Sequence, residues 1–193
     1  MEITQADHDR VAAAIAAAEA HTSGEITVVI AQASAAYSAF SFAWATLGAL
    51  AAPWPLLVFT ELSAHRIYLA QLVVFAILFA LLSRPALRLA VTPRRVRRAT
   101  AHRAAMEQFV LRGVTRTRAR TGVLVFCSLA EHYARIVADD GIAETVDKRE
   151  WQEAVDALIA AAREGRPIDG CVVAVERVGA ILARHAPREE GDV

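Results

Sequence analysis

Charged side chains are missing from two stretches of this 193-residue sequence, residues 33–60 and residues 67–83. A helix of about 20 apolar residues crosses roughly 30 Å of hydrocarbon, because each residue adds about 1.5 Å. A helix on the surface of a small soluble protein keeps a polar stripe, and residues 73–82 have none. The sequence therefore predicts a transmembrane hairpin over residues 35–90, with spans at about 38–60 and 67–83.

One face of the first predicted span carries only small residues, Ala45, Gly48, Ala49 and Ala52. The second span contains a lone amide, Gln71. Small residues let helices approach closely, and an amide in hydrocarbon finds a partner on another helix. These features predict either that the two spans pack tightly against each other or that the spans of two copies form a homodimer.

The formal net charge of zero conceals a strongly basic block in the middle of the chain. Residues 84–120 contain eleven Arg and one Glu, whereas residues 1–32 and 131–193 have net charges of −4 and −6. Seven Arg lie in residues 83–103, just after the second span, and only Arg66 lies between the spans. Because basic residues mark the cytoplasmic side of a membrane, both termini are predicted to be cytoplasmic.

The Arg residues of the segment Arg84–Arg103 also predict contact with anionic lipid head groups. Nucleic acid is not expected as a partner, because no aromatic residues alternate with these Arg as they do in a single-strand binding platform. The first residues are acidic and the apolar run begins late, so no signal peptide is expected.

Outside the two apolar stretches, the sequence predicts short strands separated by helices. The predicted strands are residues 25–32, 121–129 and 133–139, and the predicted helices are residues 4–20, 93–112, 147–165 and 171–187. A single strand before the hairpin cannot form a core by itself. Residues 1–34 and 91–187 are therefore expected to form one α/β domain, a small central sheet flanked by helices, with residues 188–193 as a tail.

Local signals at the helix ends support these boundaries. Thr4 with Asp7, and Asp147 with Glu150, have capping-box spacing, and Thr92 precedes a proline that can begin a helix. The helix that follows Thr92 is expected to bury three apolar side chains, Met106, Phe109 and Val110. The two cysteines, Cys127 and Cys171, lie in apolar stretches and are expected to be buried thiols.

Three stretches together resemble a known family. They are Ser23–Ile30, then Arg120–Glu131 followed by Ile136–Ile142, and then Trp151 with Asp169-Gly170 before a closing helix. In this order they resemble the TPM-domain family, which is named for a plant thylakoid lumen protein, a photosystem II protein and a nematode receptor modulator. The chain is most similar to the bacterial branch that carries a transmembrane hairpin inside the domain. The resemblance implies an α/β sandwich at the bacterial inner membrane.

The same resemblance implies two possible functions. Some family members are associated with assembly, repair or modulation of membrane complexes, and others with acid phosphatase activity or with calcium. The first hypothesis is a non-enzymatic accessory protein that acts on a membrane protein or complex. The alternative is a membrane-bound phosphatase that depends on a divalent cation. A third interpretation is that the hairpin performs the function and the domain only caps it.

Signatures of phosphate chemistry are largely missing from the sequence. It contains no Gly-x-x-x-x-Gly-Lys loop, and its six histidines show no metal-ligand spacing. Cys171 and Arg177 have Cys-x5-Arg spacing, but no glycine between them could form an anion-binding loop. Asp7 and Asp9 have Asp-x-Asp spacing, but they lie in the first turn of a predicted helix rather than at a strand end.

Four carboxylates remain as candidate metal ligands, namely Glu25, Glu131, Asp139 and Asp140. Each flanks the end of a predicted strand, and the ends of neighbouring strands lie close together in a sheet. Oxygen ligands of this kind suit Ca²⁺ or Mg²⁺. In the alternative interpretation, the Asp-Asp-Gly sequence at residues 139–141 is a turn with solvated carboxylates.

Overall fold

The computed structural model describes residues 3–117 and 120–188. The chain forms two compact units, Met1–Ser34 with Arg98–Val193, and Ala35–Arg97. The first unit contains a sheet of three strands, β1 (Ile26–Ala31), β2 (Val123–Ser128) and β3 (Tyr133–Ala138). These strands agree with the three that the sequence predicts, to within two residues at each end.

The sheet is mixed, with β2 between β1 and β3. Strand β1 runs parallel to β2, with Ile26 opposite Val123, and β3 runs antiparallel to β2, with Ala138 opposite Val123. Two parallel strands need a long connection. Here that connection contains the whole second unit. Every residue of β2 is buried, whereas β1 and β3 are the two edges.

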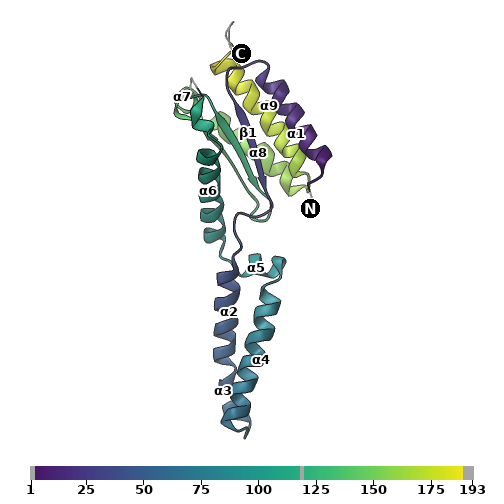
Figure 1. Ribbon diagram of the computed structural model, residues 1–193, viewed down its shortest axis with the longest axis vertical. Coiled ribbons are helices and arrows are strands. Elements are labelled where there is room, and N and C mark those ends of the chain that lie inside the picture. Colours follow the sequence, from purple (N-terminus) through teal and green to yellow (C-terminus); the bar gives the residue numbers. More distant parts are fainter. Residues whose placement is uncertain (1–2, 118–119, 189–193) are drawn as a thin grey trace. The chain divides into compact units, whose positions relative to one another are not determined.

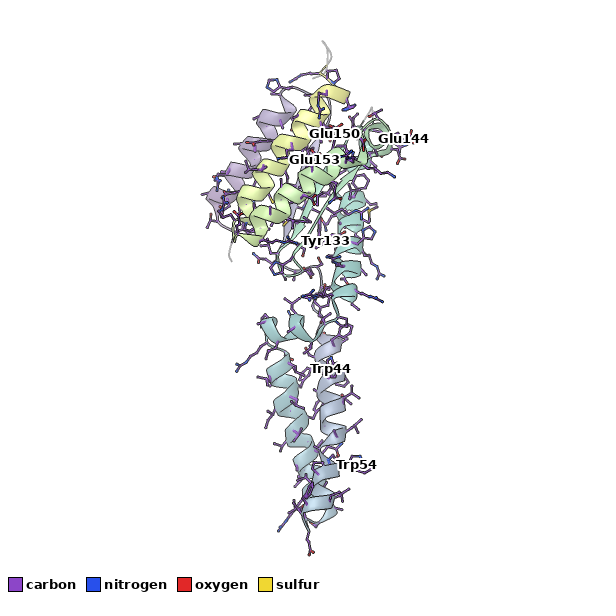
Figure 2. All side chains as sticks on the ribbon, turned by 180° about the vertical axis from the view of Figure 1, so that it is seen from behind. Trp44, Trp54, Tyr133, Glu144, Glu150 and Glu153 are labelled. Atoms are coloured by element: carbon purple, nitrogen blue, oxygen red, sulfur yellow. The ribbon has the colours of Figure 1, made fainter. Side chains whose placement is uncertain are left out.

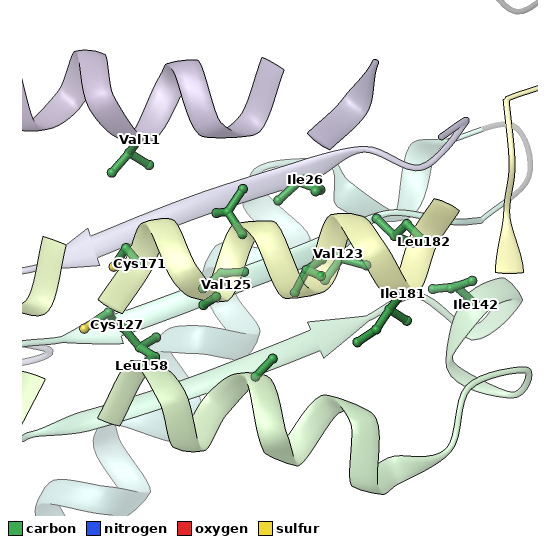
Figure 3. Close-up of a cluster of buried hydrophobic side chains, with 14 of the residues drawn as sticks. Val11, Ile26, Val123, Val125, Cys127, Ile142, Leu158, Cys171, Ile181 and Leu182 are labelled. Atoms are coloured by element: carbon green, nitrogen blue, oxygen red, sulfur yellow. The ribbon is translucent and has the colours of Figure 1, made fainter. Parts of the chain in front are cut away.

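The two faces of the sheet carry different helices (Figure 1). Because side chains alternate along a strand, Val125 and Cys127 face one side while Leu124 and Phe126 face the other. The first side forms the larger core, with α1 (Gln5–Glu19), α8 (Lys148–Arg163) and α9 (Pro167–His185), as Figure 3 shows. The second side packs on α6 (Arg94–Leu111).

Helix α1 begins with the predicted capping box. The Asp7 N–H donates to the Thr4 hydroxyl at 3.3 Å, and the Thr4 N–H donates to the Asp7 carboxylate at 3.0 Å. Together these bonds satisfy two backbone donors at the helix start. Val11 is buried from α1, and α1 packs along α9 so closely that Gly179 has no room for a side chain beside Ala18.

The predicted ends of two other helices need correction. Asp147 caps α8 by accepting from the Arg149 N–H at 2.9 Å, but the Glu150 carboxylate pairs with Arg184 of α9 instead of completing a capping box. The predicted turn at residues 139–141 is the start of a short helix, α7 (Asp140–Ala143), capped by Asp139. A 3₁₀ turn, η1 (Val114–Arg116), follows α6.

The predicted burial of α6 is correct for only one of three residues. Phe109 is buried, but Met106 and Val110 are 38% and 66% exposed. The buried stripe consists of Ala101, Ala105 and Phe109, spaced four residues apart, because only one narrow side of the helix contacts the sheet. Met106 and Val110 each lie one position beyond this stripe. The hydroxyl of Thr92 donates to the Arg88 carbonyl of α5 at 2.8 Å.

The second unit consists of α2 (Ser38–Ala51), α3 (Pro53–Phe59), α4 (Ala64–Leu82) and α5 (Pro85–Val91). Ala52 keeps helical angles, so α2 and α3 form one helix of 22 residues, and α4 has 19. By length and composition, these two helices are long and apolar enough to cross a membrane.

Small side chains line the contact between α2 and α4, where Ser41, Ala45 and Ala49 are buried. A Cβ on Gly48 would lie 2.5 Å from Leu78 of α4. Large side chains point outward instead, as Trp54 does in Figure 2. The predicted tight packing of the two helices is therefore confirmed, whereas the homodimer stays a prediction.

Candidate functional site

Two of the four predicted metal ligands lie together at one end of the sheet, where β3 ends. The side chain of Asp139 is only 2% exposed, and its Oδ1 accepts from the Asp140 N–H at 2.8 Å and from Arg120 Nη2 at 3.1 Å. The same guanidinium contacts the exposed carboxylate of Asp140 at 2.7 Å. These two aspartates raise the pKa of Arg120, chiefly through the hydrogen bond to Asp139.

The Asp139 carboxylate is therefore already engaged on one side. Its other oxygen, Oδ2, is buried and has no hydrogen-bond partner among the described residues. A cation at this position would meet the positive charge of Arg120, which lies within hydrogen-bond distance of both aspartates. The backbone of Arg120 has a φ of 53°, which lies in the left-handed region, and from this position its side chain reaches both aspartates.

The other two predicted ligands do not join this pair. Glu25 is exposed just before β1, at the same end of the sheet. Glu131 follows β2 and so lies at the opposite end, about 16 Å away along a six-residue strand. Within residues 3–117 and 120–188, no three His, Cys, Asp or Glu side chains are placed to hold one metal ion. The four carboxylates thus do not converge, and a smaller Ca²⁺ or Mg²⁺ site at Asp139 and Asp140 stays a prediction.

Glu131 instead holds the chain at the point where it leaves the sheet. Its carboxylate is 7% exposed and accepts from the Ser34 N–H at 2.8 Å and from the Ser128 hydroxyl. The hydroxyls of Ser34 and Ser128 are also hydrogen-bonded, at 2.9 Å. Ser34 is the last residue of the first unit before the hairpin segment. This buried cluster therefore fixes the end of β1 to the loop between β2 and β3.

The two cysteines are packed in the larger core, as predicted. Cys127 and Cys171 are free thiols, 3% and 0% exposed, and lie near each other between β2 and α9 (Figure 3). The hydrogen bond with Cys127, together with burial, raises the pKa of Cys171. A buried neutral thiol is not a nucleophile. The Cys-x5-Arg spacing at Cys171 and Arg177 therefore does not form a phosphate site.

The predicted lipid-binding arginines are distributed over α5 and the start of α6. Arg84 precedes α5 and Arg88 lies in its last turn. The first turn of α6 contains several Arg and no acidic residue, although a helix N-terminus already carries partial positive charge. The contact of these arginines with anionic lipid head groups stays a prediction.

The sequence patterns missed a groove along β3. Its volume is about 380 Å³. It is lined by residues of α6, of the loop before β3, of β3 itself and of α8, namely Arg98, His132, Tyr133, Ala134, Arg135, Ile136, Lys148, Trp151, Gln152, Val155 and Ile159. Tyr133 marks the start of the strand in Figure 2. The groove therefore follows the open edge of the sheet, between the helices of its two faces.

The charge of this groove has one sign. Arg98, Arg135 and Lys148 line it, and among the described residues no Asp or Glu does. Trp151 contributes an aromatic ring, and its indole N–H is buried without a hydrogen-bond partner in the described part of the chain. The groove thus combines cations with an aromatic wall, a set suited to an anionic ligand with some apolar character.

Comparison with known proteins identifies the fold but not the family. No family model and no curated protein match this chain. The NMR structure of BA42 protein from the psychrophilic bacterium Bizionia argentinensis is similar, with a TM-score of 0.60 at 18% sequence identity, covering 100% of this chain and 90% of that one. At this identity the likeness shows the fold alone. The chain thus shares an architecture of a small sheet flanked by helices, and the TPM resemblance stays a prediction.

Proposed function

We propose that this protein is a non-enzymatic accessory protein, anchored by a transmembrane hairpin in the bacterial inner membrane, which acts on a membrane protein or complex. In this proposal both termini and the sheet domain are cytoplasmic. The residues Arg84–Arg103 contact anionic head groups at the cytoplasmic surface.

The observation that carries this proposal is that α2, α3 and α4 bury small side chains and expose large apolar ones. Only 11% and 6% of the two apolar windows are buried, and the residues that are buried are small. The outward surface carries large apolar side chains, among them Phe42, Leu47, Leu50, Trp54, Leu57, Leu72, Val73 and Ile77. A soluble protein rarely exposes an apolar patch of this extent. Hydrocarbon is the solvent that suits it.

The lack of a convergent carboxylate set favours the accessory function over the phosphatase. Phosphoryl transfer needs groups that position and neutralise the transferring phosphate. Among the described residues of the predicted site, the only two carboxylates that lie together are those of Asp139 and Asp140, and both are already hydrogen-bonded to Arg120.

The topology can be tested by labelling introduced cysteines in spheroplasts. Ser63→Cys in the connection between the two apolar helices is expected to react with a membrane-impermeant maleimide from outside. Gln5→Cys, at the start of α1, is expected to react only after lysis. Both native cysteines are buried and give little background. The reverse pattern, or extraction of the protein by alkaline carbonate, would refute the proposed anchoring.

A further inference from the structure

In the part of the chain that the structure describes, no strand pairs with the outer edge of β3. The Asp139 N–H donates to the Gly122 carbonyl at 2.9 Å, so these two residues form a hydrogen-bonded pair. Hydrogen-bonded and non-hydrogen-bonded pairs alternate along an antiparallel ladder. In the observed register, Ala134, Ile136 and Ala138 fall on the non-hydrogen-bonded positions. Their backbone N–H and C=O groups therefore point away from β2.

This free edge coincides with the basic groove. Ala134 and Ile136 are both among its lining residues. Exposed sheet edges of this kind accept an additional strand from another chain, because an extended peptide satisfies the unused backbone groups. A strand added here would send its side chains alternately toward Arg98 on α6 and toward Trp151 on α8.

The charge of the groove selects the kind of strand. Three cationic side chains line it, and no carboxylate among the described lining residues neutralises them, so an acidic strand gains from electrostatic complementarity and a basic strand does not. The side chains of α8 beyond Lys148 add apolar surface at Val155 and Ile159. The ligand that fits is an extended segment in which acidic and apolar residues alternate.

We infer that the β3 edge, with Arg98, Arg135 and Lys148, binds an acidic extended segment of a partner protein as an additional strand of the sheet. This inference deepens the proposed accessory function by naming the chemistry of the partner. The accessory function itself would survive its failure, since membrane anchoring is tested separately by the labelling of Ser63→Cys and Gln5→Cys.

The test uses the full chain in nanodiscs of neutral lipid and fluorescence anisotropy of a labelled hexapeptide of alternating Glu and Val. The wild-type protein is expected to bind this peptide, and Arg98→Glu or Lys148→Glu is expected to weaken binding about tenfold, as for the loss of a charge-assisted contact. Arg149→Glu is the matched control, because Arg149 is the exposed neighbour of Lys148 and does not line the groove. Its binding is expected to equal that of wild type.

Two further measurements separate strand addition from simple charge attraction. A peptide of the same sequence with N-methylated central amides keeps its charges but cannot pair with a strand, and it is expected not to bind. Ala134→Pro removes an outward N–H without removing a bond to β2, and it is expected to reduce binding while the circular dichroism spectrum is retained.

Three results would overturn the inference. The first is no binding of the Glu-Val peptide by the wild-type protein. The second is equal binding of the N-methylated peptide, or an equal loss with Arg149→Glu. The third is that the Arg98→Glu and Lys148→Glu variants lose affinity for phosphatidylglycerol vesicles but not for the peptide, which would assign the groove to lipid.

Discussion

Gly179 of α9 and Ala18 of α1 lie in such close contact that a Cβ on Gly179 would be 2.5 Å from the Ala18 Cβ and 3.2 Å from its Cα. These helices come from opposite ends of the chain, and the second unit lies between them in the sequence. The absence of a side chain at position 179 therefore sets how closely the N-terminal segment packs on the rest of the first unit.

We expect Gly179→Ala to destabilise the protein, although alanine is the better helix former by about 1 kcal/mol. Overpacking costs about 1–3 kcal/mol and here involves the backbone of α1, which cannot rotate away. The double variant with Ala18→Gly should recover stability in a double-mutant cycle followed by thermal unfolding. Additive effects of the two substitutions would contradict the contact. Gly48→Ala is the comparison, since its obstacle is the flexible end of Leu78.

Because of the ion pair between Arg10 and Asp169, we expect the stability of the fold to depend on pH. Arg10 Nη2 lies 2.6 Å from Asp169 Oδ1, and this hydrogen bond lowers the pKa of Asp169 below its ordinary value of 3.8. A carboxylate with a lowered pKa contributes stability that is present above pH 3.8 and is lost as the pH falls through the lower folded value.

Thermal unfolding of wild type and Asp169→Asn between pH 7 and pH 2.5 checks this prediction. The melting temperatures are expected to differ at neutral pH and to approach each other in strong acid. Arg10→Gln should show the same convergence to a smaller degree, because it removes the closer of the two arginines that pair with this carboxylate and leaves Arg166. A difference that is constant over the whole range would show that the charge of Asp169 is not involved.

The two adjacent aspartates at the end of β3 are expected to differ in importance. Asp139 is buried, caps α7 and holds Arg120, so Asp139→Ala should cost about 1–3 kcal/mol. Asp140 is 73% exposed, and Asp140→Ala should cost less than about 0.5 kcal/mol. Chemical unfolding of both variants measures the difference. Equal losses of stability in the two variants would show that the cap and the burial of Asp139 do not contribute to the free energy of unfolding.

The thiols of Cys127 and Cys171 are expected to be inert in the folded protein. Both side chains are buried and therefore inaccessible to reagents, and the hydrogen bond with Cys127 raises the pKa of Cys171. A thiol reagent should therefore modify neither residue under native conditions and both after denaturation, as counted by mass spectrometry. Rapid modification of either thiol in the native state would contradict their placement in the core.

The sequence predicts most of the local structure of this protein, because the signals are local. The β-branched residues of 25–32, the alternation in residues 133–139 and the capping pair Thr4 and Asp7 each lie within a single element, and the structure reproduces these elements. The errors occur where one element meets another. The sequence of α6 allows either the stripe that contains Met106 or the stripe that contains Ala105 to face the sheet. The rotation of the helix about its own axis decides which of the two is buried.

The candidate site was harder to predict because it depends on strand order and direction. Glu131 and Asp139 both flank strand ends, but β3 runs antiparallel to β2, so they lie at opposite ends of the sheet. The groove along β3 exists because this strand is an edge, and nothing local in residues 133–138 distinguishes an edge strand from a central one. The uninterrupted basic lining at Arg98, Arg135 and Lys148 comes from three separate elements.

The position of the second unit between β1 and β2 also imposes an order on biosynthesis. β1 leaves the ribosome first, but its parallel partner β2 is made only after all four helices of Ala35–Arg97. The apolar strand Ile26–Ala31 is therefore without its partner strand while the apolar helices of the second unit are synthesised. A nascent chain that stalls before residue 128 would present this strand to chaperones and proteases. In the proposed membrane topology, insertion of the two apolar helices can therefore begin before the sheet closes.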